Sequence, residues 1–117
     1  MEKLIVKIFV NGVSKKELKL LIEKMKFENT DSFEIDIIKN SDFNESKSKE
    51  FPDGFLYFPL LIECYSNEIN KESHIYNTNI ILKELWRKNI SAIASCDYED
   101  KLVEKGGYKS KNTPWLD

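Results

Sequence analysis

Residues 73–100 read SHIYNTNIILKELWRKNISAIASCDYED, and this stretch contains three successive patterns. The first part has packing side chains at positions i, i+3, i+7, i+10 and i+11, which lie on one side of a helix. These side chains are Ile75, Thr78, Leu82, Leu85 and Trp86. The next part, ISAIASC at residues 90–96, predicts a short inner strand whose small alanines let a helix approach closely. The acidic run DYED follows at the exit of that strand.

A strand and a helix are predicted before residue 30. Residues 4–10, LIVKIFV, are rich in β-branched residues and have apolar side chains at both parities, which is typical of a central strand. The pair Asn11-Gly12 favours a turn. Ser14 then predicts a helix N-cap, and Glu17 three positions later completes a capping box. The helix has one apolar stripe, formed by Leu18, Leu21, Ile22 and Met25.

Two more strands are predicted in the middle of the chain. Residues 33–37, FEIDI, alternate between apolar and acidic side chains, as a half-buried strand does. Residues 55–65, FLYFPLLIECY, give the strongest strand signal, although Pro59 removes one backbone donor and predicts a bend, a bulge or an edge there. Between them, NSDFNESKSKEFPDG at residues 40–54 has almost no apolar content and is expected to be a long exposed connection.

The predicted order is strand, helix, strand, strand, helix, strand. Two split βαβ units of this kind favour an α+β fold, the ferredoxin-like βαββαβ sandwich, with a four-stranded antiparallel sheet and two helices on one face. A chain of 117 residues fits one domain by size, so residues 1–117 are expected to form a single domain in which 101–117 is a C-terminal tail.

Composition narrows the classes of function. The net charge is −2 and the sequence pI is about 5.5, which argues against a general binder of nucleic acid, since phosphate binding needs an excess of Lys and Arg. Cys64 and Cys96 lie in apolar runs without metal-ligand spacing, so buried thiols in a reducing cytoplasm are expected. The start MEKLIVKIFV leads directly into turn residues, so neither a signal peptide nor a membrane span is predicted there.

A sheet covered by helices on one face leaves the other face open. By parity the expected open-face residues are Lys7, Phe9, Glu34, Asp36, Tyr57, Glu63, Tyr65 and Ser95. Carboxylates with aromatic side chains among them suit a cationic protein partner, because complementary charge speeds encounter and aromatic side chains anchor an interface. RNA-binding proteins of this topology need a basic face, so nucleic acid is not expected as a partner. A solvated face with scattered charges is the alternative.

No catalytic or metal site is predicted. Asp97, Glu99 and Asp100 attract divalent cations in principle, but the run lacks the glycine spacing and length of a calcium loop. The single histidine, His74, is expected at the surface in the first turn of its helix. The neighbouring carboxylate of Asp97 opposes thiolate formation at Cys96. We therefore expect no enzyme, no cofactor and no metal.

The C-terminal part carries a resemblance to a known group of proteins. The matching elements are CDYED at residues 96–100, the Gly106-Gly107-Tyr108 element, Trp115 downstream, and FPLLIE at residues 58–63. With these elements the chain resembles small bacterial immunity-type proteins of polymorphic and contact-dependent toxin systems. The resemblance implies a cytoplasmic protein that neutralises a cognate toxin by direct binding, and it transfers no functional residues.

The leading hypothesis is therefore an immunity protein that binds a cationic toxin domain, such as a nuclease, through an acidic and aromatic surface. The candidate partner-binding residues are Asp97, Tyr98, Glu99, Asp100, Glu34, Asp36, Glu63, Tyr57, Tyr65, Tyr108 and Trp115. For Trp115 the other reading is that the ring folds back over apolar surface of its own chain. The alternative function is a small-molecule or regulatory binding domain that dimerises through its open sheet, and an enzyme is third.

Overall fold

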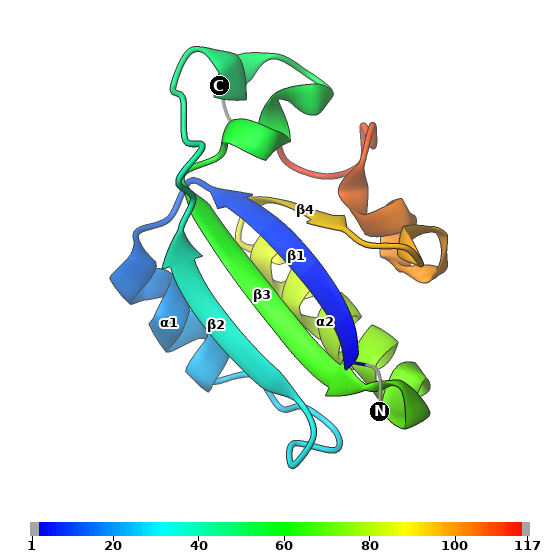
Figure 1. Ribbon diagram of the computed structural model, residues 1–117. Coiled ribbons are helices and arrows are strands. Elements are labelled where there is room, and N and C mark those ends of the chain that lie inside the picture. The colour runs from blue at the N-terminus through cyan, green and yellow to red at the C-terminus, as the bar shows by residue number, and fades with distance from the viewer. Residues whose placement is uncertain (1–2, 116–117) are drawn as a thin grey trace.

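The computed structural model describes residues 3–115. These residues form β1 (Lys3–Asn11), α1 (Lys15–Glu23), β2 (Glu34–Lys39), β3 (Leu60–Asn67), α2 (Lys71–Arg87) and β4 (Ser91–Ser95), with short 3₁₀ turns between them. The strands make one antiparallel sheet in the order β2-β3-β1-β4, and both helices lie on the same side of it (Figure 1). The predicted α+β class with a four-stranded antiparallel sheet and two helices is confirmed, and the arrangement is compatible with a ferredoxin-like sandwich.

The main core lies between the sheet and the helices. One parity of β1 and β3 faces the helices, because successive side chains of a strand point to opposite sides. The inward set on these two strands is Val6, Ile8, Val10, Leu60, Ile62 and Cys64, all buried. From the helices, Leu18, Ile22, Ile81, Leu82 and Leu85 pack against it. The small Ala92 and Ala94 of β4 lie in the same cluster, as the sequence predicted for close approach of a helix.

The helix boundaries follow local signals only in part. Ser14 caps α1 as predicted, since its Oγ accepts the backbone N–H of Glu17 at 3.1 Å. The helix ends at Glu23, so Met25 of the predicted stripe lies beyond it. In α2 the predicted Thr78, Leu82 and Leu85 are buried, while Ile75 and Trp86 are only partly buried. The predicted helical stripe missed His74, Asn77 and Ile81, which are also buried.

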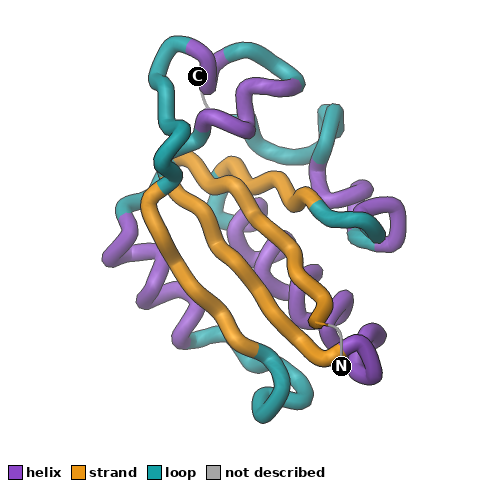
Figure 2. Tube along the Cα trace, viewed as in Figure 1, coloured by secondary structure: helices purple, strands orange, loops and turns teal. Residues whose placement is uncertain are grey.

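The 40–59 insert differs from its prediction. Asp53–Tyr57 is a 3₁₀ helix, and the strand begins only at Leu60, so the predicted strand over 55–65 is wrong in its first half. Asn40 gives the physical reason: its Nδ2 donates to the backbone carbonyls of Leu56 and Phe58, at 3.0 and 2.8 Å, in place of a neighbouring strand. The insert forms turns and loops beyond the end of β2 (Figure 2).

A second, smaller apolar cluster lies on the other face of the sheet. Phe55 and Phe58 of the insert are buried there against side chains of three strands, Phe9, Leu61 and Ile93. Trp115 and Tyr108 from the C-terminal segment pack on the same cluster. The insert is therefore not merely an exposed connection, and the C-terminal Trp folds back over apolar surface.

The remainder of the C-terminal segment is held by short turns. Glu99–Lys101 and Val103–Gly107 form two 3₁₀ turns after β4. Gly106 has a φ of +77°, a conformation that side-chain-bearing residues rarely adopt, and its backbone lies close to Ala94. Among residues 3–115, no helix is long and apolar enough to cross a bilayer.

Candidate functional site

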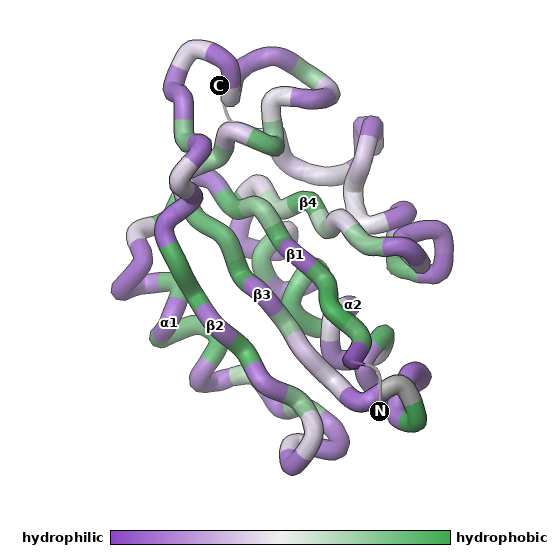
Figure 3. Tube along the Cα trace, viewed as in Figure 1, coloured by the Kyte–Doolittle hydropathy of each residue, from purple (hydrophilic) through white to green (hydrophobic). Residues whose placement is uncertain are grey.

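The open face of the sheet is divided into a covered half and a bare half. The second apolar cluster covers the half near the start of β3, where Phe9, Leu61 and Ile93 lie side by side in adjacent strands. The other half has no segment over it among residues 3–115 (Figure 1). We define the open-face patch as its six side chains Ile5, Lys7, Glu34, Asp36, Glu63 and Tyr65. Hydrophilic and hydrophobic residues alternate over residues 34–37 of β2, as a strand with one exposed face requires (Figure 3).

The sheet register brings the predicted acids of β2 and β3 together. Asp36 lies directly opposite Glu63, and Glu34 lies directly opposite Tyr65. On the far side of β3, Lys7 of β1 lies opposite Glu63. Directly opposite residues have Cβ atoms about 4.5–5.5 Å apart, so like charges there destabilise the sheet. Asp36 and Glu63 are therefore an unfavourable like-charge pair, held on a partly exposed surface.

Lys7, opposite Glu63 in the register, is the cation of the sheet that faces this pair, and it makes no close ion pair with it. Within residues 3–115, no lysine lies within ion-pairing distance of Asp36 or Glu63. The ion pair that these residues do contain joins Arg87 to Glu84 on α2, away from the patch. The pKa of Tyr65 is raised, first by its partial desolvation and then by the negative charges of Glu63 and Asp36. The phenol of Tyr65 therefore stays neutral at pH 7, beside Glu63 of its own strand and opposite Glu34 of β2.

The acids at the exit of β4 form a separate group. Asp97 and Asp100 are exposed, whereas Glu99 is half-buried and its Oε2 accepts the backbone N–H of Cys96 at 3.5 Å. Because β4 and β2 are opposite edges of the sheet, three inter-strand steps separate this group from the acids of β2, about 14 Å. Lys7 lies between them on β1. The acids therefore form two separate patches, one at the exit of β4 and one on β2 and β3, as the sequence predicted.

Tyr98 is not a surface anchor. Only 7% of it is exposed, and its hydroxyl contacts Nε2 of His74. The other ring nitrogen of His74, Nδ1, lies 2.7 Å from the hydroxyl of Ser66 on β3. The prediction of a surface His74 is also wrong, since the ring is 1% exposed: the first turn of α2 lies against the sheet, so this position faces inward. No sequence signal pairs these three residues, which come from separate elements.

The Ser66–His74–Tyr98 chain is buried, with 3%, 1% and 7% of the three residues exposed. Burial lowers the pKa of His74 from its ordinary 6.5 to about 4, so the ring is neutral at pH 7. Burial, followed by nearby negative charge, raises the pKa of Tyr98. A neutral imidazole between two hydroxyls satisfies both of its nitrogens and fixes the first turn of α2 on β3.

The other predicted aromatic anchors lie away from the open-face patch. Tyr57 is in the 3₁₀ helix of the insert, partly buried, with the Lys47 ammonium 5.1 Å from its ring centre. The hydroxyl of Tyr108 donates to Oδ1 of Asp53 at 2.7 Å and ties the C-terminal segment to the insert. Trp115 packs on Phe58. Tyr65 is therefore the predicted aromatic residue that the fold places beside the acids.

The cysteines and the remaining acids make no reactive centre among the described residues. Both thiols are free, and Cys64 is buried while Cys96 is half-buried. Burial raises the pKa of each thiol, which disfavours the reactive thiolate. No group of three His, Cys, Asp or Glu side chains within residues 3–115 is placed to hold a metal ion.

Comparison with protein-family models, with curated proteins and with solved structures gives no significant match for this chain.

Proposed function

We propose that this protein is an immunity-type binding protein of ferredoxin-like fold that neutralises a cognate bacterial toxin domain by direct contact in the cytoplasm. The open-face patch is the proposed contact surface, and a cationic face of the toxin, such as the substrate-binding face of a nuclease, is its proposed partner. This proposal rests on the surface chemistry of the chain and on the resemblance of its C-terminal elements to immunity-type proteins.

The observation that carries the proposal is the like-charge pair Asp36–Glu63. An exposed pair of directly opposed carboxylates costs stability in the free protein. A Lys or Arg from a partner removes that repulsion and forms charge-assisted hydrogen bonds to both carboxylates. Glu34 lies two residues before Asp36 on the same face of β2, and it widens the site to receive a second cation.

The uncharged members of the patch supply the rest of an interface. Ile5 is 47% exposed and lies across from Tyr65, so an apolar side chain and a phenol flank the acids. Aromatic side chains contribute strongly to interface affinity, and long-range charge contributes mainly to the association rate. The separate acids Asp97 and Asp100 lie far enough away to steer a cationic partner without contacting the same groups.

The test is binding of the purified protein to the toxin domain encoded beside its gene, measured by calorimetry at two salt concentrations. The double variant Asp36→Asn with Glu63→Gln is expected to weaken binding by about 30-fold or more and to reduce its salt dependence. The control, Asp42→Asn with Glu45→Gln, removes the same charge from exposed positions of the insert. Its affinity is expected to change by less than about threefold. Equal effects of the two variants, or the absence of any complex, would overturn the proposal.

A second candidate function uses the same face of the sheet. Ile5 and Ile38, 47% and 39% exposed on the open face, are also suited to pairing with a second copy. A small-molecule or regulatory binding domain that dimerises in this way predicts a mass that rises with concentration when no partner is present. A monomer at all concentrations excludes it.

A further inference from the structure

The outer edge of β2 is unpaired. In the sheet order β2-β3-β1-β4, strand β2 is hydrogen-bonded to β3 on one side. No segment within residues 3–115 pairs with its other side. Every second residue of an edge strand points its backbone N–H and C=O away from the sheet. Glu34–Lys39 therefore offers a row of free backbone groups to any extended chain that lies beside it.

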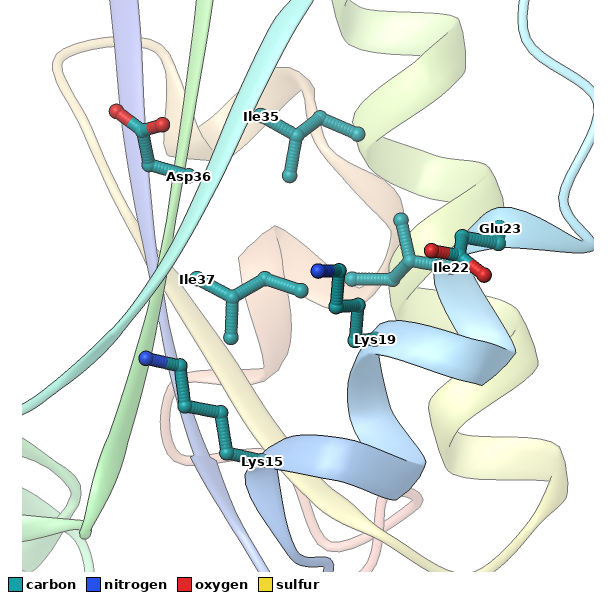
Figure 4. Close-up of a pocket in the computed structure, with 7 residues that line it drawn as sticks. All are labelled: Lys15, Lys19, Ile22, Glu23, Ile35, Asp36 and Ile37. Atoms are coloured by element: carbon teal, nitrogen blue, oxygen red, sulfur yellow. The ribbon is translucent and has the colours of Figure 1, made fainter.

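A groove runs along this edge on the helix side. It measures about 390 Å³ and lies between α1 and β2. Ile35 and Ile37 of β2 point toward α1 and form its apolar floor with Ile22 (Figure 4). The exposed Lys15 and Lys19 extend from α1 toward the strand and give this side of the edge positive charge (Figure 4). Glu23 lies at one end of the groove.

The opposite side of the same edge carries negative charge. Glu34 and Asp36 belong to the open-face parity, and Figure 4 shows Asp36 turned away from α1. Side chains of an added strand alternate between the two faces with period two. Alternate positions of such a strand therefore meet lysines and isoleucines on one side, and carboxylates on the other.

We infer that the outer edge of β2 binds an extended segment of a partner protein by β-strand addition. The segment carries acidic and aliphatic residues at one parity, against Lys15, Lys19 and the isoleucine floor, and basic residues at the other, against Glu34 and Asp36. Backbone hydrogen bonds supply affinity in this mode of recognition, and the alternating side chains supply specificity. This goes beyond the proposed function, because it uses backbone groups and α1 in place of the open face alone.

A second copy of this chain fits the edge less well. Two identical edges paired around a twofold axis bring Glu34 and Asp36 against the same acids of the other copy, and lysines against lysines. A heterologous segment with alternating charge has no such conflict. Charge complementarity on both faces thus selects a partner segment over self-association.

The experiment measures fluorescence anisotropy of a labelled peptide of about ten residues in which Glu and Val alternate with Lys and Thr. A second peptide has the same composition with its acidic and basic residues segregated into two halves. The alternating peptide is expected to bind the full chain at least about tenfold more tightly than the segregated one. In the complex, amide hydrogen exchange over residues 34–39 is expected to slow, which side-chain contact alone does not produce.

Two matched variants locate the site. The double variant Lys15→Glu with Lys19→Glu reverses the charge in the groove. It is expected to weaken binding of the alternating peptide about tenfold. Lys16→Glu with Lys26→Glu makes the same net charge change outside the groove and is expected to leave the affinity within about threefold. Equal binding of the two peptides, equal effects of the two variants, or unchanged exchange at 34–39 would each overturn the inference. A peptide-free dimer with protected 34–39 amides would assign the edge to self-pairing instead.

Discussion

The stability of the protein is expected to fall between neutral pH and about pH 4 because of one buried histidine. In the folded chain the pKa of His74 is lowered to about 4 by burial, and in the unfolded chain it returns to about 6.5. A group whose pKa is depressed on folding contributes stability above its unfolded pKa. That contribution is lost as the pH falls from the unfolded value through the folded one.

The magnitude follows from the two pKa values. A tenfold change in a protonation equilibrium corresponds to about 1.4 kcal/mol, so protonating His74 costs the folded state about 3 kcal/mol in total. About 2.5 kcal/mol of this is already lost at pH ~4.5, because the unfolded ring is almost fully protonated there. The physical origin is that neither Ser66 nor Tyr98 offers a negative charge to a buried imidazolium.

The assay is urea denaturation followed by circular dichroism at several pH values, for the wild type and for His74→Gln. Carboxylates also titrate below pH ~5, but they are common to both proteins and cancel in the difference. The variant is expected to be less stable at pH 7 and to lose less stability on acidification, so the two curves converge as the pH falls. Curves that stay parallel from pH 7 to about 4.5 would refute the assignment of a neutral, buried His74.

Three further changes test the contacts that hold the fold. Tyr98→Phe leaves Nε2 of His74 buried without its partner and is expected to lower the free energy of unfolding by about 1–3 kcal/mol; an unchanged urea midpoint would contradict the contact. Asn40→Ala removes both donations to the insert, so faster amide hydrogen exchange is expected over residues 53–58, and unaltered exchange there would show that Asn40 does not hold the 3₁₀ turn. Gly106→Ala places a Cβ 2.9 Å from the carbonyl oxygen of Ala94 at a φ of +77°, so a loss of about 1–3 kcal/mol is expected in thermal unfolding, against no loss if the turn is free to shift.

Several features of the fold follow from the sequence alone, because they depend on neighbours close in the chain. The alternation of residues 33–37 matches a strand with one exposed face, and the Ser14–Glu17 spacing matches the N-cap of α1. The pairing of Asp36 with Glu63 also agrees with their predicted parity, since side chains of one strand alternate between faces whatever the partner strand is. For the same reason the sequence alone predicts that the acids of β2 and β3 lie on the open face.

Only the tertiary structure decided which of these residues meet. Residues 55–58 are as apolar as a strand. Asn40 nevertheless donates hydrogen bonds to the backbone carbonyls of Leu56 and Phe58, and Phe55 packs on the sheet, so the chain forms a 3₁₀ helix over Asp53–Tyr57. His74 and Tyr98 come together from positions 24 residues apart. The acids after β4 are separated from those of β2 because β3 and β1 lie between them. Periodicity determines which way a side chain faces, but the order of strands in the sheet and long-range hydrogen bonds determine its neighbours.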